Sequence, residues 1–465
     1  MEILRRCPML GILLALTAGT ALYDRAGVWA FVVVTPAVFT GVMFMSYEWE
    51  LPEQWSVFVF ALAVTVLCSL RIYAVISEPP VKNLVFIGET GTVTDVRQWG
   101  SMYATVIDTE SRGKYVTFLR FPNFAEGTRI EFDGETRNFR PKMNGSDFDE
   151  TRYWKARGVN GVMSLHNPEE LPEKFSLPLM RHRLSRKLTI YMPNLTSSYL
   201  RAAWLGERDS ELTAKHRLWG TGHLLAVSGF HVGVVMLCAV FLFGNDAVMM
   251  SLILWGYILL TGCAVSAVRA GLMIQVLIAS RIFRRPYCGV NSVSLAGVLL
   301  LVWSPYLFWD IGWRLSVMSA LVISAMVQAG YSWKMISPAV GLITFPQVAY
   351  TFGGVPAAGF VLNMIAPFYF GLAFSTASLG GVLRLVNFPL SGYFMRTVEG
   401  IFIMWEKIAE LCLTVIPQTI EWNYPLAWAG CGVLTFFVCR YLELAPLRTA
   451  AAMGVIGIVA FLMFL

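Results

Sequence analysis

The sequence predicts a polytopic α-helical membrane protein with roughly 10–13 transmembrane or interfacial helices and a small OB-like β-barrel inserted on the extracytoplasmic side. Three observations support this fold class. The chain of 465 residues is 56% hydrophobic and only 14% charged, far more apolar than an ordinary soluble domain. Apolar runs that reach or approach the length of a membrane span recur along it. Residues 77–190 interrupt them with a polar stretch of short alternating segments.

The first segment, residues 1–76, is predicted to form transmembrane helices. Its first run follows Arg5 and Arg6, and we interpret it as a retained anchor because no small-residue cleavage site precedes the next run. Lys and Arg prefer the cytoplasmic ends of membrane helices, so Arg5 and Arg6 place the N-terminus inside and three crossings place the next domain outside. Over the whole chain the apolar runs lie near 8–22, 26–45, 55–76, 222–243, 247–263, 265–282, 290–303, 313–330, 336–352, 355–374, 425–440 and 449–465.

Residues 77–190 are predicted to form a water-soluble β domain. They hold 17 of the 36 Lys and Arg residues and 15 of the 30 acidic ones. Five alternating runs, separated by turn residues at strand-like spacing, indicate a small OB-like barrel: VFIGETGTVTDV, YATVIDT, KYVTFLRF, TRIEFDGET and GVNGVMSL. A basic tail, MRHRLSRK (180–187), follows where the chain returns to the membrane.

The remaining segment, residues 191–465, is predicted to be a membrane domain with polar groups at four places. Ionisable residues at membrane depth usually face a bundle interior or an aqueous path. The four places are GTGHLLAVSGFHVGVV (220–235), LTGCAVSAVRAGLM (260–273), FWDIGWRLSVMSA (308–320) and FPQVAYTFGGVPAAGFVLNMIAPF (345–368). In the first, the Ser228–Gly229 pair is a candidate helix break, and we expect Gly222, Gly229 and Gly233 to break the helix or to permit close packing.

The histidines and the serine of the first place do not favour catalysis or metal binding. An unbroken helix sets His223 and His231 roughly 80° apart, too wide for one tight metal site. No cysteine pair has metal-ligand spacing, so we expect no metal and no cofactor. Ser228 is a poor candidate nucleophile, because a helical neighbour three residues away cannot easily reach its hydroxyl in attack geometry. The sequence therefore predicts no catalytic residues and a protein that is not an enzyme.

Two interpretations of the third place stay open. Asp310 and Arg314 are four residues apart, and on a helix this spacing lets carboxylate and guanidinium meet and neutralise each other. Alternatively, the two residues line a polar path for a charged substrate, together with Arg269 and Asn363.

Taken in order, these segments resemble the competence-protein (ComEC) family of DNA-uptake channels. LGERDSELTAKHRLWGTGHLLAVSGFHVGVV (205–235) is similar to the family signature, with Val227 and Phe230 where Ile and Leu are usual. SAVRAGLM (266–273), DIGWRLSVMSAL (310–321) and a PQ…G…N…P stretch (346–367) follow in the family order. Upstream, NGSDFDETRYWKARGVNGVMS (144–164) resembles the end of the family's extracytoplasmic OB-like domain.

The resemblance implies a multi-pass channel of the bacterial inner membrane that passes single-stranded DNA into the cytoplasm during natural transformation. Its implied partners are a periplasmic DNA receptor and a cytoplasmic translocase or DNA-processing proteins. Candidate residues of the path are His223, Ser228, His231, Arg269, Asp310, Arg314 and Asn363. Aromatic rings beside positive charge suit a single strand, and candidates for DNA binding are Trp99, Tyr103, Lys114, Tyr115, Phe118 and Arg120, with Arg181, Arg183, Arg186 and Lys187 of the basic tail. The alternative is that half of the first six form the barrel core.

The resemblance has one departure, and it leaves one competing function. Many family members continue into a metallo-β-lactamase-like domain, but the HxHxDH pattern is absent here, so we expect the form without that domain and a separate nuclease. No GxxxxGK[ST] motif occurs, so energy for transport must come from partners or gradients. The alternative function is an exporter or flippase of another polyanionic or lipid-linked envelope substrate.

Overall fold

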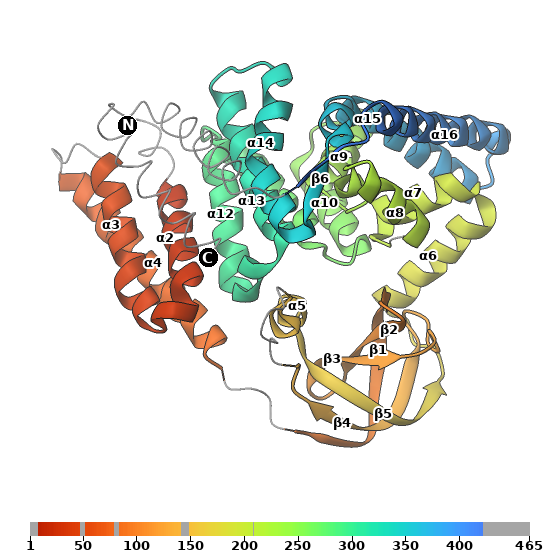
Figure 1. Ribbon diagram of the computed structural model, residues 1–465, viewed down its shortest axis with the longest axis horizontal. Helices are drawn as coiled ribbons and strands as arrows, with labels where there is room; N and C mark the ends of the chain where they lie inside the picture. Colours follow the sequence, from red (N-terminus) through yellow and green to blue (C-terminus); the bar gives the residue numbers. More distant parts are fainter. Residues whose placement is uncertain (1–7, 47–51, 79–82, 141–147, 208, 422–465) are drawn as a thin grey trace.

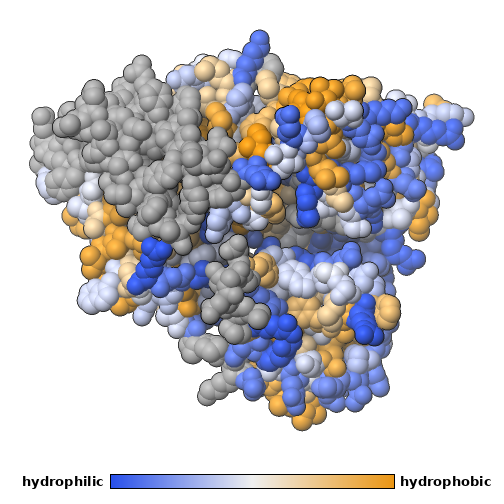
Figure 2. Space-filling model, in the orientation of Figure 1, coloured by the Kyte–Doolittle hydropathy of each residue, from blue (hydrophilic) through white to orange (hydrophobic). Residues whose placement is uncertain are grey.

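The computed structural model describes residues 8–46, 52–78, 83–140, 148–207 and 209–421. Figure 1 shows a helical body built from both ends of the described chain, with a β-barrel below it. Figure 2 shows hydrophilic residues over much of the barrel and hydrophobic residues gathered over the helical body. The predicted apolar runs near 425–440 and 449–465 lie outside the described residues.

The N-terminal helices pack against the later part of the helical body. Their core is shared with helices that lie more than two hundred residues further on, and Met9 donates its backbone N–H to the side chain of Asn291 at 3.1 Å. The elements are α2 (Pro8–Ala26), the π-helix η1 (Ala30–Val34), α3 (Thr35–Ser46) and α4 (Pro52–Ile76).

The five strands predicted between residues 77 and 190 are confirmed. They are β1 (Val85–Trp99), β2 (Met102–Thr109), β3 (Gly113–Leu119), β4 (Arg129–Arg137) and β5 (Val159–Leu171), and they close into a barrel in the order β1-β2-β3-β5-β4. The β3–β5 pair is parallel and the other pairs are antiparallel. Side chains alternate across each strand, so Ile107 and Tyr115 face the barrel interior while Val106 and Val116 face outward.

The outer face of the barrel is covered by a short helix, α5 (Glu150–Lys155). Its Trp154 is fully buried against Val116 and Val162. Trp99 and Phe118 lie at the edge of the same cluster, with ring centroids 5.2 and 6.2 Å from that of Trp154. Helix α5 is therefore part of the barrel domain, and Figure 1 places it between the barrel and the helical body.

The described C-terminal part of the helical body contains three further cores. One joins α6, α7, α8, α15 and α16, a second joins α9, α10 and α11, and a smaller third joins α13 and α14. The elements are α6 (Leu177–Tyr191), α7 (Asn194–Leu205), α8 (Ser210–Leu218), the 3-10 turn η2 (Gly222–Leu224), α9 (Gly229–Phe243), α10 (Ala247–Leu260), α11 (Val265–Ile282), α12 (Gly289–Trp303), the 3-10 turn η3 (Pro305–Trp309), α13 (Ile311–Gln328), α14 (Trp333–Phe352), β6 (Gly354–Pro356), α15 (Ala358–Leu385), α16 (Ser391–Val415) and β7 (Thr419–Glu421).

The predicted membrane class is confirmed by the helices. Five described helices are long and apolar enough to cross a membrane, at Trp55–Ile76, Val265–Ile282, Ile311–Gln328, Lys334–Phe352 and Ala358–Leu385. Shorter apolar helices lie at Ala30–Met43, Gly229–Phe243, Ala247–Leu260 and Gly289–Trp303. The chain is therefore a helical membrane protein with a small barrel domain.

Gly127 offers a test of how closely the barrel and α6 are packed. It has φ of +87°, and a Cβ at this position would lie 2.3 Å from the Cα of Leu179 on α6. We expect Gly127→Ala to destabilise the folded protein by about 1–3 kcal/mol more than a glycine substitution without this overlap. Thermal unfolding of the full chain in detergent measures the difference.

Gly100 supplies the matched control for this substitution. It also has a left-handed φ, +61°, but nothing in the described chain lies within 4 Å of a Cβ added there. Gly100→Ala therefore carries the same backbone strain without the overlap. Equal unfolding temperatures for the two variants would contradict the close packing of the barrel on α6.

Candidate functional site

The segment between η2 and α9 is a break inside the helical body. Residues 225–228 are not helical, and Ser228 has extended backbone angles, φ −131° and ψ 168°, directly before α9 begins at Gly229. Val227 is buried, whereas His223 is exposed in the 3-10 turn before the break. The break therefore sets His223 and His231 on separate elements rather than on one helix.

Ser228 and His231 are closer than the sequence predicted. The serine hydroxyl lies 3.0 Å from Nδ1 of His231, and the backbone N–H of Ser228 donates to the same nitrogen at 3.3 Å. The expectation assumed that both residues lie within one helix, and His231 reaches this hydroxyl because Ser228 is instead the N-cap of α9. The pair forms a capping box, in which the two side chains accept hydrogen bonds from backbone N–H groups at the start of α9.

The four polar places of the sequence converge on this break. Asn363 on α15 donates to the carbonyl of Gly220 at 3.3 Å. Ser266 on α11 donates to the carbonyl of Val227, and Arg269 on the same helix donates to the carbonyl of Ser316 on α13. Hydrogen bonds thus connect segments that lie up to 143 residues apart. We call this group of contacts the polar junction.

Arg269 is the most buried cation of the polar junction. Its side chain comes from α11, and the residue is 7% exposed. A Cβ added at Gly229 would lie 3.6 Å from Nη2 of Arg269, so the start of α9 packs directly against the guanidinium. Nε of Arg269 has no hydrogen-bond partner within the described part of the chain. The guanidinium thus keeps one buried donor without a protein partner beside the break.

Asp310 and Arg314 do not form the ion pair that their spacing suggested. Asp310 is the N-cap of α13, where its carboxylate accepts the backbone N–H of Trp313 at 3.1 Å and pairs with Arg157 at 3.2 Å. Arg314 instead donates from Nε to the carbonyl of Phe308 at 2.6 Å. The capping position turns the carboxylate toward the helix start and away from Arg314. Of the two interpretations that the sequence left open, the helical ion pair does not form, and the partner of Asp310 comes from the barrel domain.

Of the two roles expected of Gly222, Gly229 and Gly233, breaking the helix or permitting close packing, close packing is not observed. Nothing in the described chain lies within 4 Å of a Cβ added at Gly222 or Gly233, and Gly229 makes only ordinary contacts. The close approach occurs instead between Gly220 and Gly359, where an added Cβ on Gly220 would lie 3.0 Å from the Cα of Gly359. Gly220 has φ of +70°, which also favours glycine there.

His216 is a polar residue of this region that the sequence analysis missed. It is fully buried on α8, and its Nε2 lies 2.7 Å from the hydroxyl of Tyr199. Its Nδ1 lies 2.9 Å from the hydroxyl of Thr221, just before η2. Only its place within the signature segment 205–235 could have indicated it. Among the described residues, no group of three or more His, Cys, Asp or Glu side chains is arranged to hold a metal ion.

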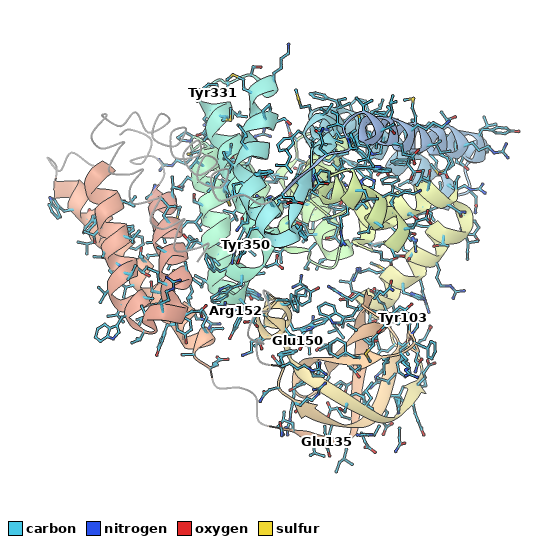
Figure 3. All side chains as sticks on the ribbon, viewed as in Figure 1. Tyr103, Glu135, Glu150, Arg152, Tyr331 and Tyr350 are labelled. Atoms are coloured by element: carbon cyan, nitrogen blue, oxygen red, sulfur yellow. The ribbon has the colours of Figure 1, made fainter. Side chains whose placement is uncertain are left out.

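The predicted DNA-binding residues divide into core and surface positions. Tyr115 is 1% exposed inside the barrel, because β3 directs it inward, so its prediction as a binding residue was wrong. Trp99 and Phe118 are half-buried in the aromatic cluster on α5, and Tyr103, labelled in Figure 3, and Lys114 are half-buried on β2 and β3. Four predicted cations are exposed: Arg120, Arg183, Arg186 and Lys187.

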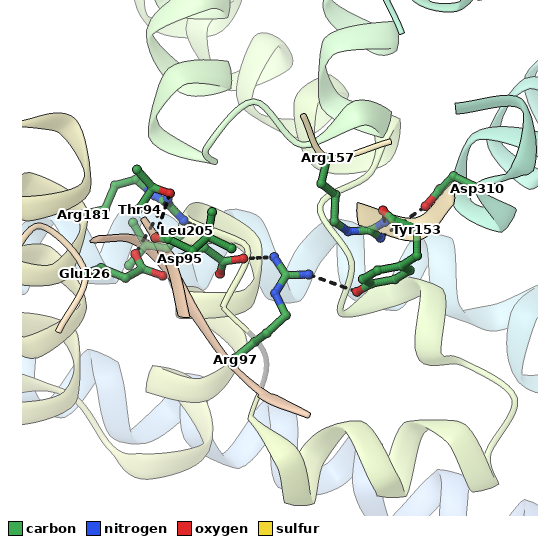
Figure 4. Close-up of polar contacts among 10 residues, drawn as sticks. Thr94, Asp95, Arg97, Glu126, Tyr153, Arg157, Arg181, Leu205 and Asp310 are labelled. Carbon is green, nitrogen blue, oxygen red and sulfur yellow. Dashed lines mark hydrogen bonds and ion pairs between the residues drawn. The ribbon is translucent and has the colours of Figure 1, made fainter. Parts of the chain in front are cut away.

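The barrel contacts the helical body on two sides (Figure 4). On one side, Arg181 of α6 donates to the carbonyl of Leu205 at 2.6 Å and lies 3.8 Å from Glu126 of the barrel, and both charged side chains are only 13% exposed. Arg181 is therefore held by protein partners, which contradicts its prediction as a DNA-binding residue. On the other side, Arg157 follows α5 and reaches Asp310. The sequence analysis singled out neither Arg157 nor Glu126.

Comparisons with known proteins agree with the order of the polar segments. The family model described as "Competence protein" matches residues 204–447, which include all four segments. The curated protein "ComE operon protein 3" of Bacillus subtilis (strain 168) is 25% identical over 344 residues, an alignment that covers 66% of this chain and 42% of the relative. The chain thus spans less than half of the length of that relative. No solved structure matches.

The contact between Glu126 and Arg181 predicts that the stability of the protein depends on pH. Burial raises the pKa of Glu126 from 4.5 to about 7, and the nearby Arg181 guanidinium opposes this rise only in part. The folded protein keeps a proton on Glu126 that the unfolded chain releases above pH 4.5. Stability should therefore fall by roughly 2–3 kcal/mol as the pH rises from 4.5 through about 7.

Thermal unfolding of the full chain over this pH range measures the effect. Glu126→Gln should remove most of the pH dependence, whereas Glu131→Gln, at an exposed position on the outside of the barrel, should not. Two results would contradict a protonated Glu126 in the folded protein. One is a wild-type unfolding temperature that rises over the same pH range, and the other is a Glu126→Gln variant with the same pH dependence as wild type.

Proposed function

Because the chain belongs to the competence protein family, we propose that it forms an inner-membrane channel that carries single-stranded DNA into the cytoplasm during natural transformation. The observation that supports this function best is the polar junction, where four separate segments meet at a break in the helical body. A bundle that only needed to be stable in lipid would not bury these polar groups, because their desolvation is costly.

The chemistry of the junction suits a polyanion. Arg269 supplies a permanent positive charge with a donor left over, and the non-helical residues 225–228 add backbone groups beside it. Irregular backbone at membrane depth is tolerated where it is enclosed by protein or lines an aqueous cavity. In this proposal the strand passes the break, and Arg269, His223 and Asn363 line its path.

The barrel is proposed to be an OB-like domain on the extracytoplasmic side that receives the strand. Closed five-stranded barrels of this class use aromatic stacking beside positive charge to bind single strands without sequence preference. Trp99 and Phe118 supply half-buried rings on its outer face, and Arg120 is an exposed cation at the end of β3. The basic face of α6, with Arg183, Arg186 and Lys187, would lead from the barrel to the membrane.

This function requires partners of three kinds. A periplasmic receptor would deliver the DNA, and a separate nuclease would remove the second strand. Because the sequence holds no nucleotide-binding motif of the GxxxxGK[ST] type, a cytoplasmic translocase or an ion gradient would supply the energy. We propose that the chain itself acts as a conduit and not as an enzyme, and the use of Ser228 and His231 to cap α9 supports this role.

A complementation experiment in a deletion strain tests the channel function. Cells carrying wild type, Arg269→Ala or Arg269→Lys are given labelled DNA, and cytoplasmic and periplasmic label are scored separately. Arg269→Ala should lower cytoplasmic entry of DNA about tenfold or more, because the path loses its central cation. Arg269→Lys should keep part of this entry, because lysine retains the positive charge. Periplasmic accumulation should persist in all strains.

The control for this experiment is Arg396→Ala, an exposed arginine on α16 that lies over Tyr393. It should import DNA as wild type does, at equal membrane abundance. Normal cytoplasmic entry in the deletion strain would contradict the proposed channel and favour the export of an envelope substrate. Normal entry with Arg269→Ala would remove Arg269 from the path.

A further inference from the structure

Four cations gather where the barrel domain meets the helical body. Arg152, Lys155 and Arg157 come from α5 and the turn after it, and Arg314 comes from the first turn of α13. Figure 3 shows Arg152 at this meeting point, with Glu150 on the same short helix. We call these four residues the α5 basic cluster.

Each cation of the α5 basic cluster lies over an aromatic ring. The guanidinium carbon is 4.2 Å from the Trp309 ring centroid for Arg152 and 3.6 Å from the Tyr153 ring for Arg157. The remaining two contacts are Lys155 over Tyr306 at 5.2 Å and Arg314 over Phe308 at 5.0 Å. Basic side chains interleaved with aromatic rings are the lining that single-stranded nucleic acids prefer.

The carboxylates in contact with the cluster pair directly with only two of its four cations. Arg152 pairs with Asp24 at 2.6 Å and with Asp149 at 3.3 Å, and Arg157 pairs with Asp310 at 3.2 Å. Among the ion pairs of the described residues, Lys155 and Arg314 have none, and each is held by a neutral oxygen, of Tyr306 and Phe308 respectively. These three carboxylates therefore pair with only two of the four cations, and Glu78 acts on Lys155 without forming an ion pair.

The ion pairs of the cluster are accessible enough to exchange. The side chains are 31% and 17% exposed for Arg157 and Asp310, and 26% and 49% exposed for Arg152 and Asp24. Pairs of this exposure contribute little stability and weaken in salt. The Glu126–Arg181 contact on the other side of the barrel is more deeply buried, with both side chains 13% exposed. The α5 side is thus the side on which a competing anion can enter.

We propose that the α5 basic cluster is a phosphate-binding site for the incoming single strand, in which a backbone phosphate replaces the Asp310 carboxylate on Arg157. A guanidinium binds phosphate as well as carboxylate, and with the same two-pronged geometry. The exchange leaves no unpaired charge on Arg157, and the released Asp310 keeps the hydrogen bond that it accepts from the backbone N–H of Trp313 at the start of α13. The proposal rests on the proposed function, because it assumes that the substrate is DNA.

The position of the cluster connects the barrel to the polar junction. Asp310 caps the start of α13, and Ser316, less than two turns further along that helix, accepts the hydrogen bond of Arg269. A strand bound at Arg157 and Arg314 therefore reaches α13 at the end that leads toward the break. The two sites would act in succession on the same strand.

A binding experiment on the full chain tests the site. The protein is placed in nanodiscs of zwitterionic phosphatidylcholine, and binding of a short fluorescent oligothymidylate is followed by anisotropy over a series of salt concentrations. Arg157→Gln should weaken binding about tenfold and lower the salt slope by about one. Asp310→Asn should instead tighten binding severalfold, because it removes the anion that competes with phosphate.

Arg129→Gln is the matched control. Arg129 is 28% exposed and pairs with Glu110 at 2.9 Å on the barrel, outside the cluster, so its loss should leave binding unchanged. Equal binding by Arg157→Gln and Arg129→Gln would overturn the proposal. Weaker binding by Asp310→Asn would also overturn it, since that result marks the pair as a structural contact only.

Two further outcomes separate this site from its alternatives. If anionic phosphatidylglycerol in the discs abolished the difference between wild type and Arg157→Gln, the cluster would be a lipid headgroup site and the proposal would be wrong. If wild type failed to bind the oligothymidylate at all, the proposed function itself would be contradicted. Binding that Arg157→Gln leaves intact would contradict only the site.

Discussion

A guanidinium inside a helical bundle must have partners, and the helical body is arranged around this requirement at Arg269. The residue is 7% exposed on α11. Its partner from α13 is the Ser316 carbonyl, and Gly229, at the start of α9, lies against the same guanidinium. A continuous helix through residues 222–243 would keep its carbonyl groups within the helix, whereas the break leaves the carbonyl of Val227 free to accept Ser266. The buried cation and the interrupted helix are therefore parts of one arrangement.

The barrel is attached to this body by two contacts of different character. On the α6 side, Gly127 permits the close approach of Leu179, and the Glu126–Arg181 contact is buried. On the α5 side, Ala156 packs into the core of the N-terminal helices, and the charged contacts around it are ion pairs that solvent and other anions can reach. Buried packing holds a domain in place, whereas accessible ion pairs permit exchange. This difference makes the α5 side the entrance in our account.

Local pattern predicted the elements, but it did not predict their partners. The five strands followed from alternation and turn residues, and the apolar runs located the membrane helices. The ion pair that helical spacing allowed between Asp310 and Arg314 does not form, because a capping position redirects a carboxylate that this spacing alone would place beside Arg314. Its true partner, Arg157, lies 153 residues away in another domain. Likewise, helical geometry separated Ser228 from His231, and the N-cap joined them.

Site-specific photocrosslinking of a strand during import tests the central claim most directly. A photoreactive phenylalanine analogue replaces Phe230, which lies beside Ser228 and His231 at the break, or Phe241, which is on the same helix and 87% exposed on the outer face of the body. Our account predicts that labelled single-stranded DNA crosslinks at position 230 and not at position 241. Import that proceeds normally while position 230 stays uncrosslinked, or crosslinks no more than position 241, would contradict a path through the break.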